Sequence, residues 1–146
     1  MKQKAIIVDL DGTLCNINHR LKYVLQKPKD WDSFYKHIWL DEINRWCEQL
    51  IEHFYVSHDI LIVSGRSDEH RRNTISWLNQ NCIEYSKVFL RKDGDYRPDE
   101  IIKKEIYRDE IEKDYEIEFV VEDRTRVVEM WRSLGLTCLQ CAKGDF

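Results

Sequence analysis

Short runs of apolar residues alternate along this chain with longer stretches in which apolar residues recur every three or four positions. The short runs are rich in β-branched residues, and this pattern predicts strands that are buried on both faces of a sheet. The predicted strands cover residues 5–10, 60–63, 88–90, 119–121 and, more weakly, 137–140.

The longer stretches have the spacing of amphipathic helices. They cover residues 41–55, 67–81, 99–113 and 125–134. Ser67 is placed as a helix N-cap, and Pro98 lies near the start of the third helix. Gly135 follows the last helix, where a left-handed residue often ends one.

Strands that alternate with helices predict a parallel sheet with right-handed crossovers. The predicted fold class is therefore α/β, a Rossmann-like domain with a central parallel sheet flanked by helices. The 146 residues suit one domain, residues 1–146. Residues 15–40 form an unusually long, aromatic-rich connection, and we expect them to make a small lid or flap beside the active edge.

Composition narrows the possible partners and compartment. A net charge of −4 argues against a protein that coats long nucleic acids, although an arginine cluster can still bind a nucleotide or a strand end. Five scattered cysteines favour the reducing cytoplasm over a disulfide framework, and we interpret Cys138 and Cys141 as positions on a terminal strand. We find neither a signal peptide nor a membrane span, so no membrane partner is expected.

Polar residues follow three of the predicted strands. They are Asp9-Leu10-Asp11-Gly12-Thr13, Ser64-Gly65-Arg66 and Glu122-Asp123-Arg124. In an open parallel sheet, ligands bind beyond the carboxyl ends of the strands, so these groups should converge. Glycines in such turns let backbone N–H groups approach an anion.

These residue types suit the cleavage of a phosphate monoester. Carboxylates such as Asp9 and Asp123 offer the hard oxygen ligands that Mg²⁺ prefers. A carboxylate can also attack phosphorus and form an aspartyl-phosphate, while Asp11 supplies a proton to the leaving oxygen. Thr13 and Ser64 offer hydroxyl donors to the phosphoryl oxygens, and a helical lysine can neutralise them further.

The four motifs in this order resemble the haloacid dehalogenase superfamily, and the second aspartate of the first motif implies phosphoester chemistry. Residues 99–106, 122–132 and 141–146 are similar to the 3′-phosphatase domain of phage polynucleotide kinase–phosphatase. The resemblance implies a Mg²⁺-dependent phosphatase that removes 3′-phosphates from DNA, RNA or nucleotides.

The resemblance also implies roles for individual residues. Asp9 would be the nucleophile, Asp11 the acid and base, and Lys103 the phosphate-binding lysine. The metal ligands would be Asp9, Asp123 and the backbone carbonyl of Asp11. The substrate phosphate or backbone would be held by Arg20 and Arg66, with Thr13, Ser64 and Gly65 beside them. Asp99 would support the lysine helix.

The sequence departs from the family pattern in three ways, one of which is a segment between Asp11 and Arg66 that is longer than in the phage domain. Glu122 stands where the family usually has aspartate, which leaves open what this supporting residue does. The chain also lacks a GxxxxGKS/T phosphate loop, so we expect any kinase or ligase to be a separate protein.

Three alternatives remain open at this stage. The protein can be a small-molecule nucleotidase or sugar phosphatase, or an inactive fold retained as a binding module. The aromatic residues between Tyr23 and Trp39 can stack a nucleobase or simply pack against their own helices.

Overall fold

A computed structural model describes residues 1–144 of the chain. Its centre is a five-stranded sheet of order β5-β4-β1-β6-β7, and every neighbouring pair of strands is parallel. The strands are β1 (Gln3–Val8), β4 (Asp59–Ser67), β5 (Lys87–Arg91), β6 (Tyr115–Glu122) and β7 (Cys138–Gln140). The predicted α/β class and all five predicted strands are confirmed.

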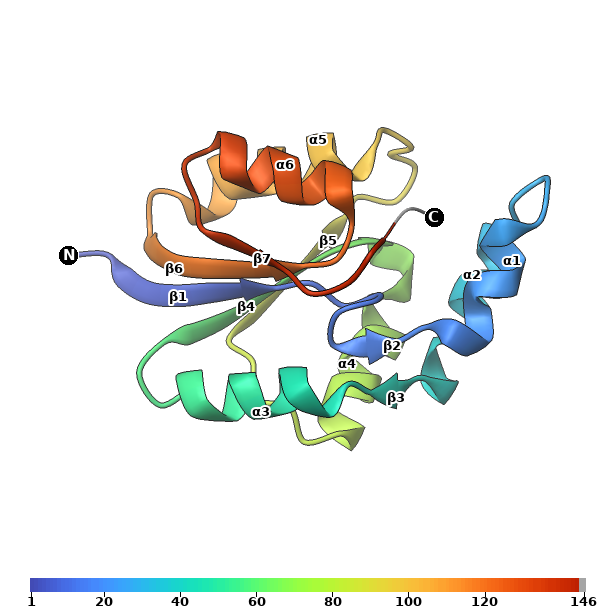
Figure 1. The fold of residues 1–146 in the computed structure, drawn as a ribbon, viewed down its shortest axis with the longest axis horizontal. Helices are drawn as coiled ribbons and strands as arrows, with labels where there is room; N and C mark the ends of the chain where they lie inside the picture. The colour runs from blue at the N-terminus through green and yellow to red at the C-terminus, as the bar shows by residue number, and fades with distance from the viewer. Residues whose placement is uncertain (145–146) are drawn as a thin grey trace.

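Helices cover both faces of this sheet, as Figure 1 shows. One face carries α3 (Arg45–Phe54) and α4 (Arg71–Gln80), and the other carries α5 (Asp99–Ile106) and α6 (Thr125–Ser133). Because β1 lies in the middle of the sheet, its side chains alternate between two cores. Ala5 and Ile7 pack on the side of α5 and α6, whereas Ile6 and Val8 pack on the side of α3 and α4.

The helix boundaries differ from the predicted ones at particular turns. The second helix starts with a 3-10 turn, Asp68–His70, and the Ser67 hydroxyl accepts a hydrogen bond from the Glu69 amide at 3.4 Å, so the predicted cap is confirmed. The helix predicted over 99–113 leaves α geometry after Ile106 and continues as a π-helical turn, Tyr107–Ile111. Gly135 has the expected left-handed backbone, with φ of +83°.

The segment after β1 folds beside the carboxyl ends of the strands (Figure 1). A small antiparallel pair, β2 (Cys15–Asn16) and β3 (Glu42–Ile43), forms its base. Between these strands lie the 3-10 turn Asn18–Arg20, α1 (Leu21–Leu25), α2 (Trp31–Lys36) and the 3-10 turn Ile38–Leu40. We refer to residues 15–43 as the lid segment, although its action as a lid stays a prediction.

Two further features bear on the sequence interpretation. The five cysteines are free thiols, with Cys138 at the start of β7 and Cys141 just after it. None of the helices within residues 1–144 has both the length and the apolar character needed to cross a membrane.

Candidate active site

The predicted site residues meet at the carboxyl edge of the sheet because β4, β1 and β6 are neighbours. Asp9 directly follows β1, Ser64 lies in β4, and Glu122 ends β6. A cleft of about 450 Å³ opens over this edge. Its lining includes the predicted residues Asp9, Asp11, Ser64, Gly65, Arg66, Asp99, Lys103, Glu122 and Asp123.

Lys103 reaches the floor of this cleft from the middle of α5. Its Nζ donates to Asp9 Oδ1 at 2.9 Å and to Glu122 Oε2 at 2.7 Å, and all three side chains are buried. Charge-assisted hydrogen bonds of this length are strong where water is excluded. Glu122 thus holds the lysine against the carboxylate expected to be the nucleophile.

Thr13 and Gly12 shape the other side of Asp9. The Thr13 hydroxyl lies 3.3 Å from Asp9 Oδ2 and 3.4 Å from Asp123 Oδ1, so it joins the two carboxylates. Gly12 has φ of +86°, and a Cβ there would lie 2.2 Å from Asp123 Oδ2. A Cβ on Gly144 would lie 2.6 Å from the same oxygen, so two glycines leave room for the Asp123 carboxylate.

Three buried carboxylates lie close together near Lys103, the one lysine of this cluster. The side-chain oxygens of Asp9, Glu122 and Asp123 lie within 4.8 Å of one another. Burial, with the nearby Glu122 charge, raises the pKa of Asp9 to about 7 although Lys103 opposes the shift. Burial and the Asp9 charge likewise raise the pKa of Asp123 to about 7.

The donor set of this cluster suits a hard divalent cation. Burial also raises the pKa of Glu122, while Lys103 partly opposes the rise. One ammonium group cannot balance three ionised carboxylates, so the cluster carries excess negative charge when all three are ionised. Carboxylate oxygens gathered in this way are the ligands that Mg²⁺ prefers.

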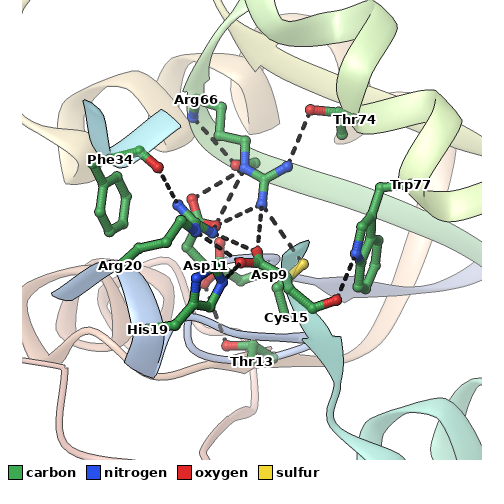
Figure 2. Close-up of polar contacts among 12 residues, drawn as sticks. Asp9, Asp11, Thr13, Cys15, His19, Arg20, Phe34, Arg66, Thr74 and Trp77 are labelled. Atoms are coloured by element: carbon green, nitrogen blue, oxygen red, sulfur yellow. Dashed lines mark hydrogen bonds and ion pairs between the residues drawn. The ribbon is translucent and has the colours of Figure 1, made fainter. Parts of the chain in front are cut away.

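Asp11 points into a separate network of arginines, as Figure 2 shows. Arg20 Nη2 donates to Asp11 Oδ1 at 2.7 Å, and Arg66 Nη2 donates to the same oxygen at 2.6 Å. Burial alone would raise the pKa of Asp11, but the charges of Arg66 and Arg20 outweigh it and hold that pKa well below its usual range. Asp11 is therefore an anion in the free protein.

The buried carboxylate of Asp41 anchors both arginines, and the sequence interpretation missed it. Arg20 donates to Asp41 through Nε at 2.8 Å and through Nη2 at 2.5 Å, and Arg66 Nη2 lies 3.7 Å away. His19 Nε2 lies 2.6 Å from Asp41 as well. The helical pattern placed Asp41 at the start of a surface helix, so no sequence signal marked it as buried.

Arg20 and Arg66 differ in their access to a ligand. Arg66 lines the cleft, whereas Arg20 is fully buried beneath Asp11 and does not line it. Arg20 also donates to the Phe34 carbonyl oxygen at 3.2 Å. In this structure, Arg20 is committed to protein partners, and its predicted contact with substrate phosphate stays a prediction.

Ser64 and Gly65 lie inside β4, which continues to Ser67, and not in a turn after residue 63 as the sequence predicted. The Ser64 hydroxyl accepts a hydrogen bond from the Arg66 amide at 3.2 Å. A Cβ on Gly65 would lie 2.5 Å from Asp99 Oδ1, so only glycine leaves room for that carboxylate. Asp99 in turn accepts hydrogen bonds from Arg91 of β5 and from Arg124 Nη1, the latter at 2.7 Å. Asp99 thus ties the start of α5, and with it Lys103, to the sheet.

Stacked rings form one wall of the cleft. Trp31 and Tyr35 of α2 stack with centroids 6.0 Å apart, and Tyr35 stacks on His70 with centroids 4.8 Å apart. All three residues line the cleft. Their stacking connects the lid segment to the turn that precedes α4. Phe34 also borders the cleft but is buried in the core, so some aromatic residues of this segment both pack in the core and line the site.

Comparison with known proteins gives consistent matches over the whole chain. The family described as the polynucleotide kinase PNKP phosphatase domain matches residues 3–146. A putative bifunctional polynucleotide kinase/RNA ligase of Autographa californica nuclear polyhedrosis virus is 29% identical over 136 residues, which cover 91% of this chain and 18% of that protein.

Solved structures show the same likeness. One structure of the Pnkp1/Rnl/Hen1 RNA repair complex contains a chain that is 35% identical, with a TM-score of 0.88 over 99% of this chain and 44% of that one. A second structure of the complex gives 34% identity and a TM-score of 0.84, over 99% and 48%. This chain thus spans less than half the length of these relatives.

A hydrolase from Streptococcus pneumoniae TIGR4 shares the fold at 16% identity, with a TM-score of 0.64 over 98% of this chain and 95% of that one.

Proposed function

Because this chain belongs to the polynucleotide kinase PNKP phosphatase domain family, whose fold and motifs are of the haloacid dehalogenase type, we propose that it removes 3′-phosphates from polynucleotide ends. The proposed route is a covalent aspartyl-phosphate on Asp9, with Mg²⁺ as cofactor. One observation carries the proposal: Asp9 lies at the floor of the cleft, hydrogen-bonded to Lys103 and within 4.8 Å of two further carboxylates.

Asp9, Asp123 and the backbone carbonyl of Asp11 are the groups that would hold the cation. Bound there, Mg²⁺ would screen the charge of the phosphate dianion from the attacking carboxylate. The excess negative charge of the buried carboxylates supports this assignment. Glu122 has a different part, because its Oε2 accepts from Lys103 and its Oε1 accepts from the Asp123 amide at 3.2 Å. Glu122 therefore fixes the positions of Lys103 and of the Asp123 backbone.

In the first step, an Asp9 carboxylate oxygen attacks phosphorus in line with the leaving 3′-oxygen. A bond forms between Asp9 and phosphorus, the bond from phosphorus to the 3′-oxygen breaks, and Asp11 gives a proton to that oxygen. Asp11 has to take this proton from solvent after substrate arrives. The incoming dianion favours this change, because a nearby negative charge raises the pKa of a carboxyl group.

In the second step, water hydrolyses the aspartyl-phosphate. Asp11 takes a proton from the water, whose oxygen attacks phosphorus and releases Asp9 and inorganic phosphate. Asp11 enters this step ionised, because it has given its proton to the leaving oxygen, and after the step the low pKa set by Arg66 and Arg20 returns the new proton to solvent.

Other side chains in the cleft bind and orient the phosphoryl group. Lys103, Thr13 and Ser64 present donors around Asp9, and donors fixed before the reaction cost little to reorganise during it. Arg66 reaches the same cleft from β4 and neutralises a further phosphate oxygen.

The matched proteins suggest partners as well as a substrate. The viral relative is a putative polynucleotide kinase/RNA ligase, and the two solved relatives belong to a Pnkp1/Rnl/Hen1 RNA repair complex. We propose that this domain likewise works in nucleic-acid repair beside a kinase or a ligase. Removal of a 3′-phosphate leaves the 3′-hydroxyl that strand joining uses.

The decisive experiment replaces the nucleophile. Asp9→Asn removes the attacking carboxylate but keeps nearly the same shape, so release of phosphate from a 3′-phosphorylated oligonucleotide should be abolished. Wild-type protein with Mg²⁺ should form an acid-stable phosphorylated adduct, and the variant should not. Phosphate release at the wild-type rate by the Asp9→Asn protein would refute the mechanism.

A further inference from the structure

Two exposed aromatic side chains line the cleft above Asp9, and the proposed chemistry uses neither. Trp31 of α2 is 38% exposed, and Tyr96, in the loop between β5 and α5, is 93% exposed. Within residues 1–144, the other exposed aromatic residues lie outside this cleft, and they are Trp39, Trp46 and Tyr55. Exposure of a large ring in water is unfavourable, so rings gathered at a binding cleft indicate a ligand that covers them.

The Trp31 ring is held in place before any ligand arrives. Its plane lies at 20° to that of Tyr35, and the Tyr35 ring lies at 29° to that of His70. Trp31 is therefore the outermost ring of a stack that begins at His70, in the 3-10 turn just before α4. A ring fixed in this way loses little conformational freedom when it stacks on a ligand.

Positive charges accompany these rings. Lys29 and Arg126 both line the cleft, and no salt bridge found within residues 1–144 includes either of them. Lys29 Nζ lies 5.5 Å from the centre of the Trp31 ring. Aromatic platforms beside unpaired cations are the features with which proteins bind single strands of nucleic acid. A nucleobase has a flat aromatic face that can stack on such a ring, and a sugar has none.

We propose that Trp31 and Tyr96 bind the terminal nucleobase of the strand whose 3′-phosphate reacts at Asp9. The inference rests on the proposed function and adds a substrate class: the favoured substrate is a nucleotide end that carries its base. Lys29 and Arg126 contact the phosphodiester backbone beyond that base.

The test compares two oligonucleotides that differ only in one base. Both carry a 3′-phosphate, and in one of them the terminal residue is abasic. The wild-type kcat/KM should be on the order of tenfold to a hundredfold higher for the end that carries a base, the range expected from stacking on an aromatic side chain. Trp31→Ala and Tyr96→Ala should each lose most of that preference, because kcat/KM falls further for the end that carries a base than for the abasic end. Trp31→Phe keeps a ring and should keep most of the preference.

Trp39→Ala provides the matched control. Trp39 belongs to the same lid segment and is 67% exposed, but it lies outside the cleft, so its variant should keep the full preference for the base. Equal wild-type turnover of the two ends would overturn the inference, as would equal losses on both ends in the Trp31→Ala protein. If the wild type with Mg²⁺ releases phosphate from neither oligonucleotide, the proposed function itself fails, and this result is distinct from the other two.

Discussion

At the scale of single residues, the site depends on small differences between neighbours in sequence. Lys103 and Lys104 are adjacent on α5, yet Lys103 is buried against Asp9 and Glu122 while Lys104 is exposed. Helical periodicity places them about 100° apart, so only one of them can point to the sheet. The resemblance assigns the phosphate-binding role to Lys103, the lysine that lies beside Asp9, and this role stays a prediction.

This difference gives a direct comparison of two lysine variants. Lys103→Met removes the ammonium group that faces Asp9, so phosphate release should fall by on the order of a hundredfold or more. Lys104→Met changes only an exposed side chain and should stay within about twofold of the wild type. Both proteins are assayed on a 3′-phosphorylated oligonucleotide with Mg²⁺, and comparable losses in both would contradict the assignment.

Gly12 offers a second comparison at this scale. Gly12 and Gly94 have similar left-handed backbones, with φ of +86° and +82°, but nothing lies within 4 Å of a Cβ on Gly94. Alanine at either position should introduce a similar backbone strain of about 1–2 kcal/mol. Only Gly12→Ala should also displace Asp123 and weaken Mg²⁺ activation, which a Mg²⁺ titration of phosphate release measures. If Gly94→Ala raised the Mg²⁺ requirement equally, the clash with Asp123 would not be its cause.

At the scale of elements, the hydrophobic pattern predicted the strands and helices that pack in the core. It missed the features that depend on polar contacts. The buried runs marked β1, β4, β5 and β6 because each packs between two helical layers, whereas β7, the weaker prediction, buries only Cys138 against one of them. The same pattern carries no information about the order β5-β4-β1-β6-β7, which depends on contacts between distant elements. The short elements of the lid segment have too few residues to show a helical or strand period of hydrophobic positions. The turn at Tyr107–Ile111 keeps helical spacing, so its π geometry was invisible.

Asp41 connects the lid segment to the sheet, and its removal should loosen that connection. Asp41→Ala leaves the buried Arg20 without its main partner, so the free energy of unfolding should fall by about 3–5 kcal/mol. Glu42→Ala, a change at the exposed next residue, should have little effect on stability. Urea denaturation of the two variants measures the difference, and an Asp41→Ala protein as stable as Glu42→Ala would show that the network carries no net stability.

At the scale of the whole molecule, the buried carboxylates couple folding to pH and to metal. The pKa values of Asp9 and Asp123 rise from an ordinary 3.8 to about 7 in the folded protein. Between about pH 4 and pH 7, the folded state therefore holds protons that the unfolded state has lost, so these groups make stability fall as pH rises. Above about pH 7 their destabilising effect is complete.

Mg²⁺ should offset the loss of stability that these carboxylates cause at higher pH. In EDTA, the melting temperature should fall between pH 5 and pH 7 through the contribution of these two groups. Because a cation takes the place of the lost protons, the stabilisation by Mg²⁺ should be larger at pH 8 than at pH 5. Thermal melts in EDTA and in Mg²⁺ at each pH give the difference directly. An equal stabilisation by Mg²⁺ at both pH values would contradict the coupling between metal binding and pH. Asp123→Asn should abolish most of the stabilisation by Mg²⁺.

The packing around Asp123 also bears on when the enzyme becomes active. Its carboxylate fits between Gly12, from the first turn of the chain, and Gly144, the last residue that the structure describes. A polypeptide emerging from the ribosome cannot assemble this site until Asp9 and Asp123 have both been made and brought together. Partly synthesised or partly refolded molecules should therefore be inert toward phosphate esters, and the recovery of turnover during refolding should report the final assembly of the domain.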